Sequence, residues 1–240
     1  MEIISGAALP FYHEVSARGP FCRTVARRFL KAHLPLSPVC AEFANQQVEH
    51  IRTHPHGYNI QPGIVDTAYG LDTEPVLEQL GALLGVLGVD AKIPSTLDTQ
   101  LLLCLTAQFH HDLHAWDNAL FLNWYLAGPE RDFIVAGVGR VTLRPGDVIL
   151  FDPSRPHALL QSSKPKFTKS GLTANDVDAM SLFLSADIEL TPVLDTFFDI
   201  ERGPRSIFKE KKLTDIDNLK VNRYTGELIL PDDNTSKAVA

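Results

Sequence analysis

The run LLLCLTAQFHHD, residues 101–112, decides which fold this chain adopts. Its first half is unbroken apolar sequence, and it ends in two histidines and an aspartate. Successive side chains of a β-strand point to opposite faces, so His110 and Asp112 would share one face. Two ligands of a single metal ion need that arrangement. The run therefore predicts a strand that carries two candidate metal ligands at its end.

A second stretch, PGDVILFDPSRPH at residues 145–157, supplies a third candidate ligand. It contains a Pro-Gly turn, a short apolar strand and a polar turn that ends at His157. Two histidines and one carboxylate on one face of an octahedral metal leave positions open, as in non-haem Fe(II) oxygenases. We predict that His110, Asp112 and His157 are the ligands. His114 stays open as a replacement for one of them if the first strand ends early.

These residues carry a resemblance to a known family. His110-His111-Asp112, followed by Pro145-Gly146-Asp147 and then His157, resembles the HxD…H pattern of the Fe(II)- and 2-oxoglutarate-dependent dioxygenases, over residues 96–188. The resemblance implies a double-stranded β-helix, or jelly-roll barrel, that binds Fe(II) and 2-oxoglutarate. It also implies oxidation of a C–H bond, with release of succinate and CO2.

Hydrophobic periodicity changes along the chain from a helical to a strand pattern. We expect a mainly β chain with N-terminal helices (an α+β fold), in which a jelly-roll barrel is buttressed by those helices. Helices are predicted over residues 23–34, 37–53 and 76–87, with Ser37 as an N-cap. Short strands are predicted over residues 101–109, 120–126, 132–136, 140–143, 147–151, 157–161 and 179–188.

The chain is expected to form one structural domain in three parts. Residues 1–95 would be a helical region that packs on the barrel, and residues 96–190 the catalytic core. Residues 191–240 would be an extension with a short helix over 192–200, a hairpin over 220–230 and a flexible tail.

Composition limits the possible partners and compartments. The 240 residues carry a formal net charge of −7, with a pI near 5.7, which argues against a nucleic-acid-binding surface. No apolar run approaches the roughly 18 residues of a membrane span, and the start of the chain does not read as a signal peptide. The three cysteines form no CxxC pair. We therefore expect a cytoplasmic protein with reduced thiols.

Strand alternation suggests further site residues. Cys104, Thr106 and Gln108 would share the face of His110 and line the barrel interior, so Thr106 or Gln108 could hydrogen-bond the cosubstrate. Leu103, Leu105 and Phe109 would pack outward beneath the helices. Asn123, Tyr125 and Trp116 are candidates for the substrate pocket, and ordinary core packing is the alternative for each of the three.

The carboxylate of 2-oxoglutarate far from the metal needs a cationic partner. The family that the sequence resembles commonly places an arginine two residues before a serine or threonine on the last strand. Ser181 could be that hydroxyl, but the residue two before it is Ala179. We therefore expect the cation to come from elsewhere, in the order Lys166, Lys164, Arg140.

Three functions stay open from sequence alone. The first is a 2-oxoglutarate-dependent oxygenase that acts on a small-molecule or amino-acid-type substrate. The second is a cupin-like metalloenzyme that does not use 2-oxoglutarate, which the missing arginine favours and the HxD pattern opposes. The third is a non-catalytic metal-binding barrel. The sequence carries no signal for the oligomeric state.

Overall fold

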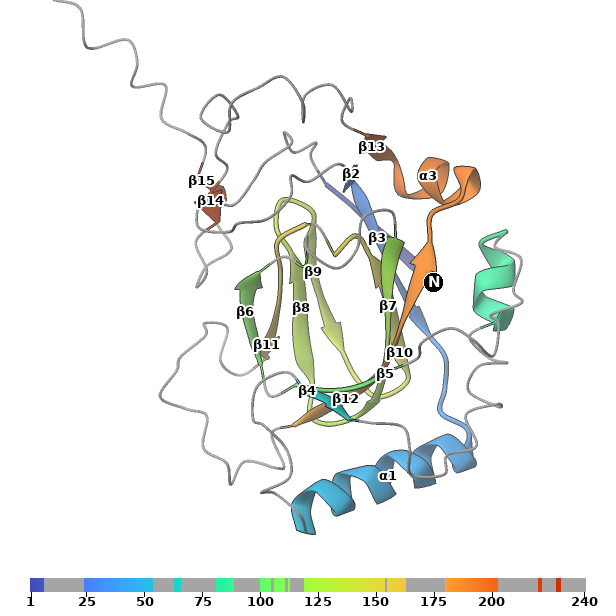
Figure 1. Ribbon diagram of the computed structural model, residues 1–240, viewed down its shortest axis with the longest axis vertical. Helices are drawn as coiled ribbons and strands as arrows, with labels where there is room; N and C mark the ends of the chain where they lie inside the picture. The colour runs from blue at the N-terminus through green and yellow to red at the C-terminus, as the bar shows by residue number, and fades with distance from the viewer. Residues whose placement is uncertain are drawn as a thin grey trace, which may run out of the picture.

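The computed structural model describes a discontinuous part of the chain, to which all structural statements below refer. It covers residues 1–6, 24–53, 63–65, 81–88, 100–104, 106–110, 112, 119–153, 155–162, 180–202, 220–221 and 228–229. Eleven β-strands of this part form two antiparallel sheets (Figure 1).

The larger sheet has seven strands, and every neighbouring pair in it is antiparallel. In spatial order the strands are β1 (Glu2–Ser5), β3 (Arg28–His33), β10 (Asp147–Phe151), β7 (Ala119–Ala127), β12 (Ser181–Glu189), β5 (Gln100–Cys104) and β4 (Gly63–Val65).

The smaller sheet has four strands, which are also antiparallel. Its order is β6 (Ala107–His110), β11 (His157–Gln161), β8 (Arg131–Val135) and β9 (Gly139–Leu143). From β5 to β12 the chain passes repeatedly from one sheet to the other, and only β8 and β9 are consecutive strands of the same sheet. The two sheets are therefore joined by many crossings.

Apolar side chains from both sheets meet in one cluster between them, called here the interior. The larger sheet contributes residues from β3, β7, β10 and β12, and the smaller sheet contributes residues from β8, β9 and β11. Its buried members are Phe29, Tyr125, Phe133, Val135, Val141, Leu143, Ile149, Phe151, Leu159 and Phe183. The two sheets thus form a two-layered sandwich whose hydrophobic core lies between them.

Helices cover the outer face of the larger sheet. The helix α1 (Pro38–Thr53), a helical segment at residues 81–86 and the helix α3 (Pro192–Phe198) contribute to a second core cluster with the outward side chains of that sheet. Ser37 caps α1, because its Oγ accepts the N–H of Cys40 at 3.2 Å. The predicted helices that begin at Ser37 and Pro192 are confirmed, and the one over 76–87 is confirmed for its described part.

The helix predicted over residues 23–34 is wrong. This segment forms β2 (Thr24–Ala26) and β3, and β3 lies between β1 and β10. Both faces of β3 are covered: Phe29 packs in the interior, and Leu30 and Ala32 pack in the helix-covered cluster. A strand buried on both faces loses the apolar–polar alternation that identifies strands, so its apolar spacing could be taken for a helix.

The single strand predicted over residues 101–109 is also wrong. The run forms two strands, β5 in the larger sheet and β6 in the smaller one. Cys104 still packs against the interior, as predicted. Beyond the crossing, Ala107 also packs against the interior, whereas Phe109 packs on the outer face of the smaller sheet rather than beneath the helices. The change of sheet breaks the simple alternation between Cys104 and His110.

The Pro-Gly turn before β10 forms as predicted. Gly146 has φ +93°, a conformation that L-residues with a Cβ rarely adopt, and an added Cβ would meet the His33 ring at 2.9 Å. The N–H of Gly146 donates to the carbonyl of Tyr125 at 2.7 Å, which ties this turn to β7. Glycine at this position therefore allows the close approach that sets where β10 begins.

The C-terminal part holds two small strand pairs. β13 (Ile200–Arg202) pairs with β2, and β14 (Lys220–Val221) pairs with β15 (Leu228–Ile229), which confirms the predicted hairpin. Among the described residues, no helix is both long and apolar enough to cross a bilayer. The division of the chain into three parts stays a prediction.

Candidate metal centre

Three polar residues meet where β6 ends and β11 begins. His110 is the last residue of β6, His157 is the first residue of β11, and the two are register partners across the pair. Asp112 follows β6, and its N–H donates to the carbonyl of Pro153 at 2.9 Å. One ligand atom from each of His110, Asp112 and His157 lies within 4.8 Å of the others. The structure thus brings together the three residues that the sequence pattern selected.

Backbone carbonyls set the orientation of both imidazole rings. His110 Nδ1 lies 2.7 Å from the carbonyl oxygen of Gln108, and His157 Nδ1 lies 2.8 Å from that of Arg155. A carbonyl only accepts hydrogen bonds, so each Nδ1 must carry the proton. Each neutral ring then has its lone pair on Nε2. Such a bond from the non-ligating nitrogen is the usual support of a metal-bound histidine.

The Nε2 atoms face the carboxylate. His110 Nε2 lies 3.8 Å from Asp112 Oδ1, and His157 Nε2 lies 3.5 Å from Asp112 Oδ2. The two imidazole rings are 4.4 Å apart between centroids. Three lone-pair donors therefore converge at the end of this strand pair. The donor set and its supporting bonds fit a divalent metal ion such as Fe(II).

One side of this group is packed and the other faces solvent. The side chain of His157 is 7% exposed, against 32% for Asp112 and 40% for His110. Phe151 and Phe133 cover His157 from the interior, with ring centroids at 4.7 and 6.1 Å. A metal held here would be shielded on its interior side and accessible on the other, which leaves room for further ligands.

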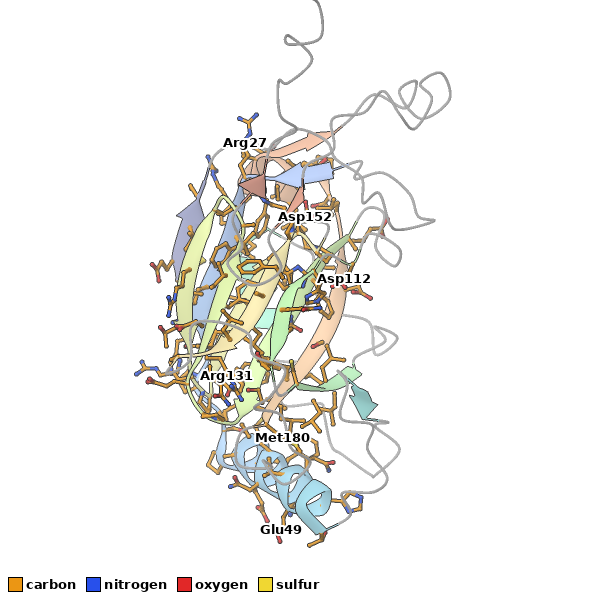
Figure 2. All side chains as sticks on the ribbon, turned by 90° about the vertical axis from the view of Figure 1, so that its left-hand side faces the viewer. Arg27, Glu49, Asp112, Arg131, Asp152 and Met180 are labelled. Carbon is orange, nitrogen blue, oxygen red and sulfur yellow. The ribbon has the colours of Figure 1, made fainter. Side chains whose placement is uncertain are left out.

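The interior also holds a buried arginine some distance from the ligands. Val135 of β8 is the register partner of His157, and Arg131 lies four residues earlier, on the same face of the strand. At about 3.3 Å per residue this separation is roughly 13 Å along the strand. In Figure 2 the labels of Asp112 and Arg131 accordingly lie at different heights along the strands.

Arg131 belongs to a hydrogen-bonded group of three residues, called here the arginine cluster. Its Nε donates to Ser181 Oγ at 2.7 Å, and the hydroxyls of Tyr125 and Ser181 are 3.1 Å apart. Tyr125 also donates to the carbonyl of Pro129. Arg131, Tyr125 and Ser181 are all fully buried. A buried guanidinium beside two hydroxyls can bind a carboxylate through charge-assisted hydrogen bonds, so this cluster is a candidate anion site.

Burial shifts the ionisation of the groups around Arg131. It lowers the pKa of Arg131 itself, against the opposing influence of Tyr125 and Cys104. It raises the pKa of Tyr125, and it raises that of Cys104 to about 11. Tyr125 and Cys104 therefore stay neutral near pH 7 and bring no negative charge to the arginine. Neither group neutralises the positive charge that a bound anion would meet.

The predicted pocket residues that are described lie on the interior face or close to it. Asn123 shares the face of Tyr125 on β7, and its Oδ1 accepts a hydrogen bond from Ser185. The hydroxyl of Thr106 donates to the carbonyl of Leu159 at 2.8 Å. This bond joins the segment between β5 and β6 to β11. Gln108 bonds to the His110 ring through its backbone carbonyl and not through its side chain.

The cationic candidates from the sequence have different surroundings. Arg140 donates to Asp132, which also accepts the hydroxyl of Thr142 at 2.9 Å. Asp132 is next to Arg131 in β8, so this ion pair lies on the opposite face of the smaller sheet from the interior. Other candidates lie outside the described residues, namely Lys164, Lys166, Trp116, His111 and His114.

Arg131 is a candidate site residue that sequence reasoning missed. The predicted strand began at residue 132, which left Arg131 in the preceding turn with no assigned face. The signal was the alternation RDFIV, in which Arg131, Phe133 and Val135 share one face. That face can be identified as the interior only once the register of Val135 with His157 is known.

Comparisons with known proteins give structural similarity only. No family model matches the chain, and no curated protein matches it in sequence. A prolyl-4-hydroxylase from Pseudomonas putida is 12% identical, with a TM-score of 0.40 over 68% of this chain and 92% of its own. SnoN, a non-heme alpha-ketoglutarate-dependent epimerase from nogalamycin biosynthesis, is 17% identical, with a TM-score of 0.43 over 82% and 92%.

A third structure is that of EctD from S. alaskensis with bound Fe, which is 14% identical with a TM-score of 0.35, over 75% of this chain and 78% of its own. Similarities of this size carry no argument about activity, so the assignment depends on the chain's own geometry.

Proposed function

We propose that this protein is a non-haem Fe(II)- and 2-oxoglutarate-dependent oxygenase built on a double-stranded β-helix. The observation that carries the proposal is the convergence of His110 Nε2, Asp112 and His157 Nε2, with both Nδ1 atoms bonded to backbone carbonyls. Two histidines and one carboxylate with an open side are the ligand set of non-haem Fe(II) oxygenases. The strand order of the two sheets supports the fold.

In this proposal the ligand residues hold the metal on its packed side. His157 fixes the metal against Phe151 and Phe133, and the more exposed His110 and Asp112 border the open side. Fe(II) would supply the O2 activation that couples decarboxylation of 2-oxoglutarate to oxidation of a substrate C–H bond. The chain's contribution would be to leave the open side of the metal free for the cosubstrate and O2.

The arginine cluster would bind the carboxylate of 2-oxoglutarate far from the metal. Arg131 supplies the positive charge, and Ser181 and Tyr125 supply hydroxyls beside it. Arg131 and the ligands share the interior, and the cosubstrate would span the interval between them. An arginine can bind a carboxylate through two parallel bonds, which fixes orientation as well as charge. This role would replace the arginine that is absent from β12, the last strand of the larger sheet along the chain.

The substrate is proposed to be a small molecule or an amino-acid derivative. Asn123 and Ser185 form a polar pair on the interior faces of β7 and β12. Along β7 this pair lies between Phe121 and Tyr125. Phe121 itself packs on Phe151. In this proposal the polar pair would hydrogen-bond the substrate.

The test is an anaerobic titration of the Fe(II)-loaded protein with 2-oxoglutarate, followed by an aerobic assay of succinate release with ascorbate. We expect a visible metal-to-ligand absorption band that saturates with 2-oxoglutarate, and slow succinate release even without the natural substrate. Asp112→Ala is the control, and it should show neither signal.

The outcomes separate the possible functions. Iron binding without a 2-oxoglutarate band would overturn the proposed cosubstrate and favour a cupin-like metalloenzyme. A band without succinate release under any condition would leave metal and cosubstrate binding but reject catalysis of the proposed type. Failure to bind a divalent metal would reject the centre itself.

A further inference from the structure

The turn between β10 and β11 supports two of the three candidate ligands through its backbone. The Pro153 carbonyl accepts the N–H of Asp112 at 2.9 Å, and the Arg155 carbonyl accepts Nδ1 of His157 at 2.8 Å. The Pro156 carbonyl accepts the N–H of Ala136 at 2.8 Å, which holds the turn against the end of β8. Displacement of this turn would therefore move both Asp112 and His157.

Two buried side chains in the same turn reach a distant part of the chain. Asp152 is 4% exposed, and its Oδ2 accepts the N–H of Ala26 at 2.9 Å. Arg155 is 1% exposed and donates from Nη1 to the Ala26 carbonyl at 2.5 Å and from Nη2 to the Ala136 carbonyl at 3.0 Å. Both polar backbone groups of Ala26 are thus bonded to side chains of the ligand-bearing turn.

Ala26 and its neighbours also bind to the part of the chain around α3 and β13. Ala26 lies in β2, where its register partner is Ile200 of β13. The next residue, Arg27, donates its N–H to the carbonyls of Phe198 and Asp199 at the end of α3. Arg28 also donates to the Phe197 carbonyl at 3.0 Å. In Figure 2, Asp152 and Arg27 lie at the same end of the sheets, on the other side of Asp112 from Arg131.

We propose that Asp152 and Arg155 are positioning residues of the metal centre, which make the segment 24–28 a structural part of it. They act on Asp112 and His157 through the backbone of the turn and contact neither the metal nor the cosubstrate. This inference rests on the proposed metal centre. It extends the centre from the ligand strands to β2, β13 and the end of α3.

The physical reason is that the bonds on the turn are buried and specific in geometry. Arg155 bridges the carbonyls of Ala26 in β2 and of Ala136, which follows β8, with the fork of its guanidinium. Lysine cannot reproduce this bridge with one ammonium. Asp152 accepts a backbone N–H, a role in which asparagine keeps an acceptor oxygen but loses the charge. Changes to groups that support metal ligands commonly weaken metal affinity by about 10- to 100-fold.

The test measures metal affinity directly. Co(II) is titrated into the apo forms of the wild type, Arg155→Met, Arg155→Lys and Asp152→Asn, and its visible absorption reports the coordination. We expect a dissociation constant about 10- to 100-fold higher for Arg155→Met, a smaller rise for the other two variants, and an altered Co(II) spectrum. Arg140→Met, which breaks an ion pair on the outer face of the same sheet, is the matched control.

A second readout uses the linkage between the two regions. Because coupling is reciprocal, metal binding should slow hydrogen–deuterium exchange at the amides of Ala26 and Arg27 in the wild type. In Asp152→Asn this protection by the metal should shrink, whereas any protection in β9 should be the same in both proteins. A purely structural role would lower the stability of the apo protein without changing the Co(II) spectrum or this linkage.

The proposal is overturned if Arg155→Met binds Co(II) with wild-type affinity and spectrum, or if Arg140→Met weakens binding equally. If Arg155→Met does not fold, Arg155→Lys and Asp152→Asn decide in the same way. A wild type that binds no metal would reject the proposed function instead, so the two failures are distinguishable.

Discussion

The two polar groups of the interior differ in what holds them. The candidate ligands lie at strand ends, are held by backbone carbonyls, and are partly open to solvent. The arginine cluster lies within the body of the sheets, is held by side-chain hydroxyls, and is fully buried. A strand end can leave coordination positions free, whereas a strand body can exclude water from a charge. This difference supports the proposal of a reactive centre at the first group and of anion recognition at the second.

The largest effect on metal binding should come from removing one of the three candidate ligands. Asp112→Ala removes the carboxylate that lies between the two Nε2 atoms. Since changes to supporting groups alone cost about 10- to 100-fold, loss of a ligand should weaken Fe(II) or Co(II) binding by more than about 100-fold. Metal content after dialysis and calorimetric titration would measure it.

His111→Ala is the control for this variant, because strand alternation predicts that His111 faces away from the ligands. It should keep the metal. Stoichiometric iron in Asp112→Ala would contradict the ligand assignment, and loss of iron in His111→Ala would mean that the register is wrong by one residue.

Breaking the arginine cluster should leave the metal and lose the cosubstrate. Arg131→Met removes a buried cation, and loss of one partner of a buried charge pair costs about 2–5 kcal/mol of binding free energy. Affinity for 2-oxoglutarate should therefore fall by about 30-fold or more, with metal affinity unchanged. The affinity of Arg131→Lys for 2-oxoglutarate should lie between those of the wild type and Arg131→Met. Lysine keeps the positive charge but cannot form two parallel bonds to a carboxylate.

Arg140→Met is matched to Arg131→Met and also decides between the two arginines. Arg140 pairs with Asp132 on the outer face, so its loss should not change the 2-oxoglutarate titration. The opposite ranking of the two variants would return the role to Arg140, the third of the cationic candidates predicted from sequence.

The smallest effect concerns the thiol beside the arginine cluster. Burial raises the pKa of Cys104 from 9.0 to about 11, so the folded state favours the neutral thiol. This contribution is fully present below pH 9 and is lost as the pH rises from 9 towards 11, because the unfolded chain releases its proton first. Since Cys104 keeps some exposed surface, we expect a loss of about 1 kcal/mol rather than the full 2–3 kcal/mol of the shift.

Urea unfolding between about pH 8 and 11 measures this contribution as a difference between the wild type and two variants. Cys104→Ala and Cys104→Ser both remove the titrating group, so both should have the same, shallower pH dependence. Parallel pH profiles for all three proteins would show that the thiol does not contribute.

The same comparison explains what could be predicted from sequence. The three candidate ligands can be predicted because they follow apolar runs and turns, which are local signals in the sequence. His110 and Asp112 were placed on one face by alternation, and His157 followed a Pro-rich turn. The boundaries of β7, β10 and β11 were also close to those predicted, since Gly, Pro and polar residues mark their ends.

The arginine cluster needed information that no local pattern holds. Arg131 can be placed on the interior face only from the pairing of β8 with β11, and this pairing cannot be read from the local sequence. The strand β3 was missed for a related reason, because burial of both faces depends on its neighbours β1 and β10. The division of residues 101–110 between two sheets likewise depends on tertiary packing that overrides alternation.

The pairing of His110 with His157 has a consequence for folding. The strands β7 to β10 all lie between these two residues in the chain, so a bound metal would close a long loop of the polypeptide. Closure restricts the unfolded ensemble, and any ligand that prefers the native state adds about 2.7 kcal/mol to its stability at 100 times its dissociation constant. Iron at this position would also hold the fold together, so chelation should lower the melting temperature of the protein as well as abolish its activity.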